Sequence, residues 1–317
     1  MQAKRAATFK VAVLGTLILA AATAASCSGS VSAKSHGTIA SHLIFGGPPE
    51  CPGRITCLLG LQQTYRLHFQ GFKSLDEVGP LSVAALASNA VQVVRLNSSD
   101  PSIPKQGFVI LQDDLAFQQA GNIIPVIRTD KATDEVRSLL DAISATMTQR
   151  DLFMLDSAVG SEHQDPRAVA RAYVQQKDIG AIATPDANLS ITVGSAAFPE
   201  NEMLADVYIE VLSRAGYKVN AALNLGNRET YEPMLEKGQV DLMPEYVGNY
   251  LAFVNSTVGR VELASAVSQL RESLAPKGLT VLDPSSATDS DTVVVTKSTA
   301  DRFHLTNISD LGRMISG

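Results

Sequence analysis

Residues 189–216 read LSITVGSAAFPENEMLADVYIEVLSRAG and indicate a strand, a glycine turn and a helix. The apolar run at the start is typical of a β-strand. Apolar residues then recur at helical spacing from Met203 to Leu212, and Gly216 ends the helix. The pattern continues with further strands expected over 217–225, 240–246 and 279–286, and a short helix over 229–238. This alternation predicts βαβ units with parallel strands.

The stretch that begins at His42 repeats the same plan. Strands are expected over 42–47, 67–75, 91–100 and 108–114, with helices over 58–66 and 79–89. Segments 111–129 and 282–296 each read as strand, polar loop and strand, which is the pattern of a chain that crosses between two lobes. The sequence therefore predicts an α/β fold of two lobes with two crossover hinge strands, and a ligand cleft between the lobes.

The expected boundaries follow from this repeat. We assign residues 42–118 together with 290–317 to lobe 2, and residues 119–289 to lobe 1. Lobe 1 includes a small, polar, proline-bearing linker at 180–188.

The first 27 residues form a separate signal. Lys4, Arg5 and Lys10 precede an apolar run of about fifteen residues, from Val11 to Ala25, which is shorter than the roughly 20 residues of a membrane span. The run ends in Ala-Ala-Ser-Cys. We predict a lipoprotein signal peptide over 1–27, lipid on Cys27 and a flexible tether over 28–41. The chain would then lie outside the cytoplasm, anchored to the cell membrane. Ordinary secretion, with Cys27 incidental, is the alternative.

Two more cysteines, Cys51 and Cys57, lie in a loop rich in glycine and proline. Outside the cytoplasm such a close pair favours a disulfide. A metal site would need more ligands, and His42 and His68 are isolated. No metal and no cofactor is therefore expected.

Composition excludes some functions. The net charge of −6 does not suggest nucleic acid as a partner, and aromatic residues make up only 5% of the chain, with no Trp. None of the five histidines lies in a recognisable catalytic motif, and no nucleophile elbow is present. A monomeric binding protein is expected rather than an enzyme.

Two motifs add a family resemblance. Residues 193–200, VGSAAFPE, and 244–249, PEYVGN, resemble segments of the osmoprotectant substrate-binding proteins of ABC importers, which bind glycine betaine, choline or proline betaine. FGGPPECPGR at 45–54, SSD at 98–100 and LQDD at 111–114 resemble later segments of that family. The resemblance covers nearly all of residues 42–317 and implies a periplasmic-binding-protein type II fold. It also implies an ABC permease and its ATPase as partners.

The order of these segments differs from the family. There the G-S-x-x-F-x-E segment comes first, whereas here it follows the F-G loop. Joining Gly317 to Ser41 would restore the family order, with the linker at 180–188 in place of the family's termini. We interpret the chain as a circular permutant; a mis-assembled gene is the alternative.

The resemblance also implies site residues. Tyr246 matches one tyrosine of the cage that surrounds a quaternary ammonium group, while the other cage positions fall near Asp291, Asn97 and Gly121, none of them aromatic. Glu50 and Arg54 match the family's E-x-x-x-R, whose Arg meets a ligand carboxylate. The full set of expected ligand-binding residues is Tyr246, Asn249, Arg228, Ser195, Phe198, Glu50, Arg54, Asn97 and Asp291.

A structural role without ligand contact is the alternative for several of these residues. Tyr246 could be a core or rim tyrosine, and Glu50 with Arg54 a surface ion pair of little energetic weight. Because the cage is incomplete and the expected cleft is polar, we keep two alternatives to an osmoprotectant receptor. One is a binding protein for another polar or anionic small molecule, and the other is a sensor lipoprotein without a role in transport.

Overall fold

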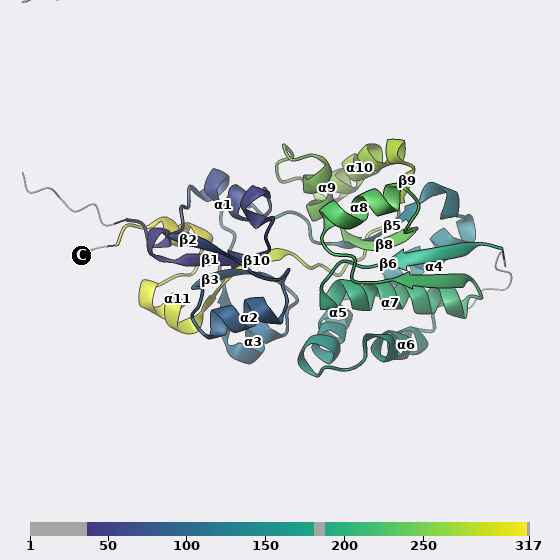
Figure 1. The fold of residues 1–317 in the computed structure, drawn as a ribbon, viewed down its shortest axis with the longest axis horizontal. Coiled ribbons are helices and arrows are strands. Elements are labelled where there is room, and N and C mark those ends of the chain that lie inside the picture. The colour runs from purple at the N-terminus through teal and green to yellow at the C-terminus, as the bar shows by residue number, and fades with distance from the viewer. Residues whose placement is uncertain (1–36, 181–187, 316–317) are drawn as a thin grey trace, which may run out of the picture. The chain divides into compact units, whose positions relative to one another are not determined.

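The computed structural model describes residues 37–180 and 188–315, and Figure 1 shows two β-sheets, each covered by helices. We call the part built on the first sheet lobe 2. Its strands are β1 (Ile44–Gly47), β2 (Gly71–Ser74), β3 (Val93–Asn97), β4 (Phe108–Ile110) and β10 (Asp291–Thr296). Its helices are α1 (Leu58–Tyr65), α2 (Pro80–Ala87), α3 (Ser102–Gln106) and α11 (Lys297–Phe303).

The other part, lobe 1, holds the second sheet. Its strands are β5 (Ile123–Arg128), β6 (Ser190–Gly194), β7 (Lys218–Ala222), β8 (Leu242–Tyr246) and β9 (Leu279–Val281). Its helices are α4 (Asp134–Thr146), α5 (Gln149–Asp156), α6 (Pro166–Lys177), α7 (Pro199–Arg214), α8 (Arg228–Glu236), α9 (Val247–Val254) and α10 (Leu263–Leu274).

The two sheets have the same internal order. In lobe 2 the order is β2-β1-β3-β10-β4, and in lobe 1 it is β7-β6-β8-β5-β9. In each sheet the first three strands in this order run parallel, and the fourth is antiparallel to both of its neighbours. That fourth strand, β10 or β5, is the one that enters from the other lobe. The predicted two-lobed α/β fold with two crossover strands is therefore confirmed.

The crossover segments touch as they pass between the lobes. Asn122 bridges Thr288 in an antiparallel pair, and the Asp289 N–H donates to the Gly121 carbonyl at 2.8 Å. A Cβ at position 121 would lie 2.2 Å from the Asp289 carbonyl oxygen, so only glycine allows this approach. The chain thus passes between the lobes as a paired, two-stranded hinge.

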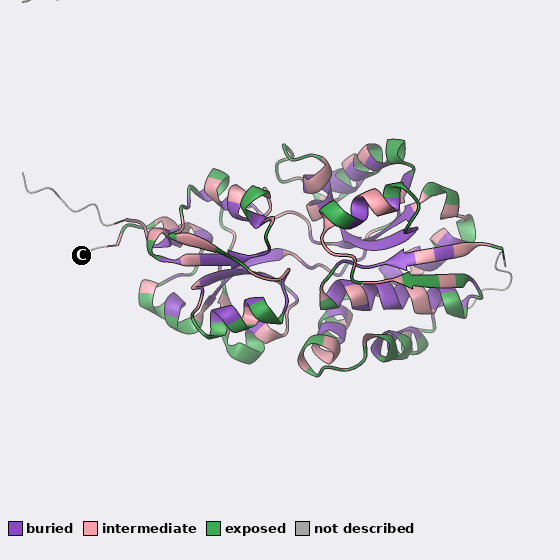
Figure 2. Cartoon of the chain, in the orientation of Figure 1, coloured by how far each residue is buried: buried purple, intermediate pink, exposed green. Residues whose placement is uncertain are grey.

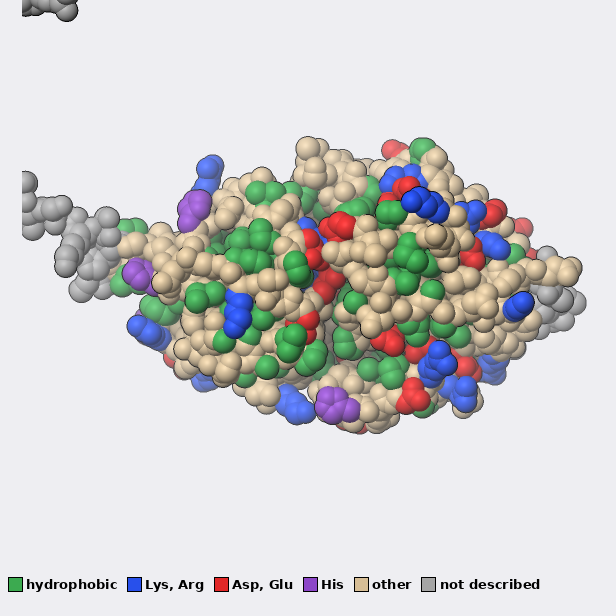
Figure 3. Space-filling model, viewed as in Figure 1, with side chains coloured by type: hydrophobic (Ala, Val, Ile, Leu, Met, Phe, Trp, Pro, Cys, Tyr) green, Lys and Arg blue, Asp and Glu red, His purple; other side chains and the backbone are tan. Residues whose placement is uncertain are grey.

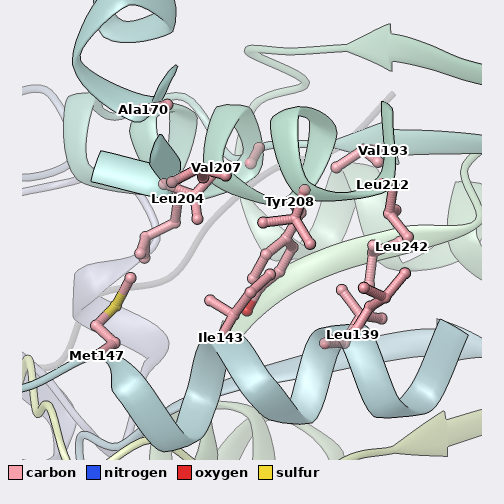
Figure 4. Packing of buried hydrophobic residues seen from close by; sticks show 14 of the residues in the cluster. Leu139, Ile143, Met147, Ala170, Val193, Leu204, Val207, Tyr208, Leu212 and Leu242 are labelled. Carbon is pink, nitrogen blue, oxygen red and sulfur yellow. The ribbon is translucent and has the colours of Figure 1, made fainter. Parts of the chain in front are cut away.

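The largest core joins the helices of lobe 1 to its sheet. Leu139 and Ile143 of α4 face Leu204 and Tyr208 of α7, with Val193 and Leu242 of the sheet beside them (Figure 4). In Figure 2 the strands are mostly buried, while the helices expose their outer faces. Because each lobe has a core of its own, the residues between the lobes are free to form a site.

Helix α7 begins earlier than its apolar periodicity predicts. Phe198 is the N-cap and Pro199 the first residue, which suits proline because it has no N–H to leave unpaired. Glu200 therefore lies in the first turn, where the positive end of the helix dipole favours a carboxylate. This places the FPE motif at a helix start beside the hinge.

The expected tether ends before residue 41. The Ile39 N–H donates to the Arg313 carbonyl at 2.9 Å, Thr38 bridges Met314, and Ala40 is fully buried. These residues pack because Ile39 and Ala40 are apolar and extend the core of lobe 2. The signal peptide, Cys27, residues 28–36 of the tether and residues 181–187 of the linker lie outside the described residues. Within the described residues, no helix has both the length and the apolar character that a membrane crossing requires.

Candidate binding cleft

Both lobes contribute to one small polar cleft. It has a volume of about 20 Å³, roughly the room that one water molecule needs. Seven of the nine residues predicted from the sequence line it: Arg54, Asn97, Phe198, Arg228, Tyr246, Asn249 and Asp291. Its other lining residues are Thr56, Glu77, Arg95, Ala196, Tyr231 and Asp289.

Ser195 and Glu50 do not line the cleft. Ser195 is fully buried, and its Oγ accepts a hydrogen bond from the Asn224 N–H at 2.8 Å. It therefore holds the turn after β6 in place instead of facing a ligand. Glu50 forms an ion pair with Arg54 at 3.0 Å. For these two residues the structure directs the side chain away from the cleft.

Arg54 is held by three carboxylates from both lobes. The disulfide between Cys51 and Cys57, which the structure confirms, closes the loop from which it projects. Besides Glu50, its guanidinium contacts Glu77 at 3.2 Å and Glu229 of lobe 1 at 2.7 Å. Burial alone would raise the pKa of Glu229, but its hydrogen bond to Arg54 prevails and lowers it. Arg54 thus connects the lobes across the mouth of the cleft.

Arg228 is committed to a buried carboxylate. It donates to both oxygens of Glu245, at 3.0 and 2.7 Å, and the Tyr231 hydroxyl donates to the same carboxylate at 2.7 Å. The guanidinium also lies 5.5 Å from the ring centre of Tyr250 and 5.8 Å from that of Phe253. Burial opposes the charge on Arg228, yet Glu245 outweighs it and the pKa of Arg228 is raised. Its role here is to neutralise Glu245 at the cleft wall.

Arg95 is a cleft residue that the sequence did not single out. It lies on β3, where its register partner is Val293 of β10. Its Nη2 contacts Asp291, which lies on β10 two residues before Val293. Its Nη1 is buried and has no hydrogen-bond partner, although the side chain lines the cleft. An unpaired buried donor of this kind is costly unless a ligand meets it. The signal in the sequence was a charged residue inside the apolar strand VVRLN.

A hydrogen-bonded chain of acids joins the hinge to Tyr246. The Ser99 hydroxyl contacts Asp289 at 2.9 Å and Glu200 at 2.6 Å, and the Tyr246 hydroxyl donates to Glu200 at 2.5 Å. Tyr246 is only 4% exposed, and its ring lies 6.1 Å from that of Phe198. Burial raises the pKa values of Glu200 and Asp289 well above their ordinary range, so both carboxyls favour the protonated form.

The cleft offers hydrogen bonds and charge more than aromatic faces. The hydroxyls of Tyr231 and Tyr246 donate hydrogen bonds to Glu245 and Glu200, respectively. These two tyrosines and Phe198 are the aromatic residues that line the cleft. Among the described residues, no group of three or more His, Cys, Asp or Glu is arranged to hold a metal ion. The arrangement presents charge and hydrogen-bonding groups from both lobes to a cleft that, in this structure, has room for about one water molecule.

Two like-ordered sheets, a paired hinge and a polar cleft define a two-lobed binding protein of the periplasmic type II class. The family model described as the substrate-binding domain of the ABC-type glycine betaine transport system matches residues 32–176 and 190–316. The chain therefore belongs to this family.

Individual relatives are distant. A glycine-betaine-binding protein of Pseudomonas aeruginosa is 23% identical over 127 residues, which is 40% of this chain and 40% of that protein. The glycine betaine-binding protein YehZ of Escherichia coli is 24% identical over 147 residues, 43% of this chain and 46% of that protein. The chain thus aligns with less than half the length of these curated relatives. Among solved structures, a probable amino-acid ABC transporter binding protein, YtmK of Bacillus subtilis, is 12% identical, with 85% of this chain and 88% of that one covered and a TM-score of 0.42.

Proposed function

We propose that this chain is the extracytoplasmic substrate-binding component of an ABC importer, and that it binds one small solute in the cleft between its lobes. The observation that carries the proposal is that seven of nine residues chosen from the sequence line one cleft made by both lobes. Family membership supports the same role. The solute would be delivered to a membrane permease driven by its ATPase.

Family membership favours a glycine betaine-like or choline-like quaternary amine as the solute. Tyr246 and Phe198 would face the ammonium group, and the unpaired Nη1 of Arg95 would donate to a carboxylate. Asn97 and Asn249, one from each lobe, would hydrogen-bond the remaining polar atoms. Asp291 would take part only through Arg95, to which it is bound.

A second candidate solute is another polar or anionic small molecule. The free donor of Arg95 and the few aromatic faces in the cleft favour it. For such a ligand Arg54 would exchange one of its carboxylate partners for the solute, as the E-x-x-x-R resemblance implies. A sensor that keeps the same fold without transport would bind in the same place, and the choice of solute does not decide between these roles.

Binding would act on the hinge. The lobes are joined by the paired segments around Gly121 and Asp289, and Arg54 reaches Glu229 across the cleft. A solute that contacts both lobes binds the closed arrangement more tightly than the open one, and this difference in affinity shifts the protein toward the closed arrangement. Closure would present a surface formed by both lobes to the permease.

The N-terminus would anchor the protein. In this proposal the signal peptide over 1–27 is removed, lipid is attached to Cys27, and the chain works as a monomer beside its permease. Metabolic labelling with a radioactive fatty acid tests the anchor: label in the wild type and none in Cys27→Ser supports it, and equal label in both contradicts it.

We also propose that the chain is circularly permuted. The match to the family model breaks at 177–189, where the linker was expected. The described ends are adjacent, because the Ile315 N–H donates to the Gly37 carbonyl at 3.2 Å. A chain that opens between residues 180 and 188 and joins residue 317 to Gly37, so that Ile39 and Ala40 stay in the core of lobe 2, should fold and bind the same solute. Failure of that chain to fold would contradict the permutation.

The functional proposal is tested by thermal unfolding of residues 28–317 with glycine betaine, choline, proline betaine, sugars, polyols and amino acids. A solute at about 100 times its dissociation constant should add about 2.7 kcal/mol to the free energy of unfolding. The shift should be lost in Asn97→Leu, which blocks the cleft, and kept in the surface variant Asp301→Asn. No shift with any of these solutes would contradict the proposal.

A further inference from the structure

The buried guanidinium of Arg95 marks the place where the head of a solute would bind. Arg95 is only 7% exposed, it lines the cleft, and its Nη1 has no hydrogen-bond partner among the described residues. The other two arginines of the cleft, Arg54 and Arg228, already donate to carboxylates. Leaving a buried donor unpaired is costly, and a guanidinium binds a carboxylate more strongly than a neutral acceptor. Arg95 therefore calls for a carboxylate.

Hydrogen-bond acceptors lie next to this donor. Asp291 and Asn97 are register partners on β10 and β3, and Asn97 is two residues from Arg95, so all three side chains lie on one face of the sheet. Asp291 and Asn97 both line the cleft. A cation with N–H groups can donate to these side chains, whereas a quaternary ammonium ion has no N–H to donate. The wall beside Arg95 therefore suits a primary ammonium group.

The spacing of the two charges on the solute follows from the guanidinium. Asp291 is held at Nη2 of Arg95, and the unpaired donor is Nη1 of the same planar group. A carboxylate at Nη1 would therefore lie beside Asp291. A solute that meets both groups must carry its carboxylate and its ammonium on one carbon, as an α-amino acid does. A zwitterion whose charges are several carbons apart would meet one group and miss the other.

A larger cavity continues from the cleft and shares Asn97 and Phe198 with it. Its volume is about 620 Å³, within the range of small-molecule sites. It is lined from lobe 2 by α2 and the segment after β3, and from lobe 1 by the end of α5, the turn η4 (Ser157–Ser161) and the start of α7. Figure 3 shows acidic side chains along the junction of the two lobes and hydrophobic side chains on both sides of its lower part.

The wall of this cavity favours an apolar body. The apolar side chains that form much of it are Val78, Pro80, Val83, Ala84, Ala87, Pro101, Val159, Phe198 and Pro199. Two of its carboxyls, those of Asp156 and Glu200, are buried, which raises their pKa values, so both favour the neutral form. Because the cleft itself has room for about one water molecule, a larger solute held at Arg95 would extend past Phe198 into this cavity.

We propose that the solute is an α-amino acid with an extended apolar side chain. Its carboxylate accepts from Arg95, its ammonium group donates to Asp291 and Asn97, and its side chain occupies the cavity beyond Phe198. This inference rests on the proposed binding role of the cleft and narrows the second candidate solute of that proposal to one chemical class.

The test is calorimetric titration of residues 28–317 with four probes: norleucine, its N-trimethylated form, 6-aminohexanoate and glycine. Norleucine should bind at least about tenfold more tightly than the trimethylated form, which lacks the N–H donors, and than 6-aminohexanoate, which separates the charges. It should bind on the order of a hundredfold more tightly than glycine, because each buried CH₂ group contributes roughly fourfold.

Two variants separate the head of the solute from its side chain. Asp291→Asn keeps an acceptor for Arg95 but removes the negative charge, and it should weaken norleucine about tenfold. Ala84 is exposed on α2 and lines the cavity, so Ala84→Phe should fill the cavity and weaken norleucine toward the affinity of glycine. The matched control Ala84→Ser, which adds little volume, should leave norleucine binding unchanged.

Three results with the wild type would overturn the inference, and they hold even if a variant fails to fold. Equal binding of norleucine and its trimethylated form would remove the need for N–H groups. Equal binding of 6-aminohexanoate would remove the need for adjacent charges, and equal binding of glycine would remove the role of the cavity. In each case a solute still binds, so the receptor proposal stands while this inference fails. If none of the four probes binds but glycine betaine does, the outcome is the same, whereas no binding of any solute in the thermal panel contradicts both.

Discussion

Replacing Asp156 by asparagine should change how the stability of this protein depends on pH. In the folded state burial raises the pKa of this carboxyl to about 8, from an ordinary value of 3.8. Between these two pH values the folded state holds a proton that the unfolded state has lost. The free energy of unfolding of the wild type must therefore fall as pH rises through this window.

The slope is set by one proton. Each pH unit inside the window lowers the free energy of unfolding by about 1.4 kcal/mol, so the wild type should lose about 2.7 kcal/mol from this group between pH 5 and pH 7. Asparagine carries no charge at either pH and removes this loss. Glu200 and Asp289 have raised pKa values of the same sign and remain in both proteins. Because Asp156 contributes to the raised pKa of Glu200, the difference between variant and wild type reports Asp156 together with its coupling to Glu200.

The assay is urea unfolding at pH 5, 6 and 7 for the wild type, Asp156→Asn and the control Glu162→Gln. The stability advantage of Asp156→Asn over the wild type should be about 2 to 3 kcal/mol larger at pH 7 than at pH 5. Glu162→Gln should follow the wild type. If the Asp156→Asn and wild-type curves stay parallel within about 0.5 kcal/mol, Asp156 is not held neutral by burial and the reasoning fails.

Three further outcomes are expected. Arg228→Met should cost about 3 to 5 kcal/mol because it leaves Glu245 buried and unpaired, and urea unfolding should show that adding Glu245→Gln recovers part of this loss; no recovery would mean that the pair is not the cause. Glu229→Gln should change the free energy of unfolding by less than about 1 kcal/mol, since its ion pair with Arg54 is partly exposed. It should nevertheless enlarge the radius of gyration of the ligand-free protein in X-ray scattering. An unchanged radius would show that this contact does not hold the lobes together. Replacing Cys51 and Cys57 together by serine should cost about 2 kcal/mol for a ring this small, and a loss near zero in urea unfolding would show that the loop is ordered without its bridge.

The fold could be predicted from the sequence because the patterns that indicate its helices and strands are local. The apolar spacing of residues 203–212 gives α7, and the Asp165-Pro166 pair gives the start of α6, where the Asp165 side chain accepts from the Arg167 N–H. Repetition of the same element order in both halves gave the two sheets. Helix α3 was not predicted, because it is five residues long and contains Pro104.

The candidate site could be predicted only in part, because its contacts join segments that lie far apart in the chain. Motif positions brought seven residues to the cleft, but they could not say that Arg228 would be bound by Glu245, or that Arg54 would reach Glu229 from the other lobe. Arg95 and Asp156 depend on contacts between segments far apart in the chain, so no local pattern reveals them. Burial of charge is a property of the assembled lobes.

The central claim is that one solute binds between the lobes at Asn97. The measurement that tests it most directly is calorimetric titration with the solute that gives the largest thermal shift, in the wild type and in Asn97→Leu. We predict one site per chain in the wild type and no detectable binding in the variant, with both proteins folded by circular dichroism. Equal binding in both proteins would locate the solute elsewhere and contradict the account.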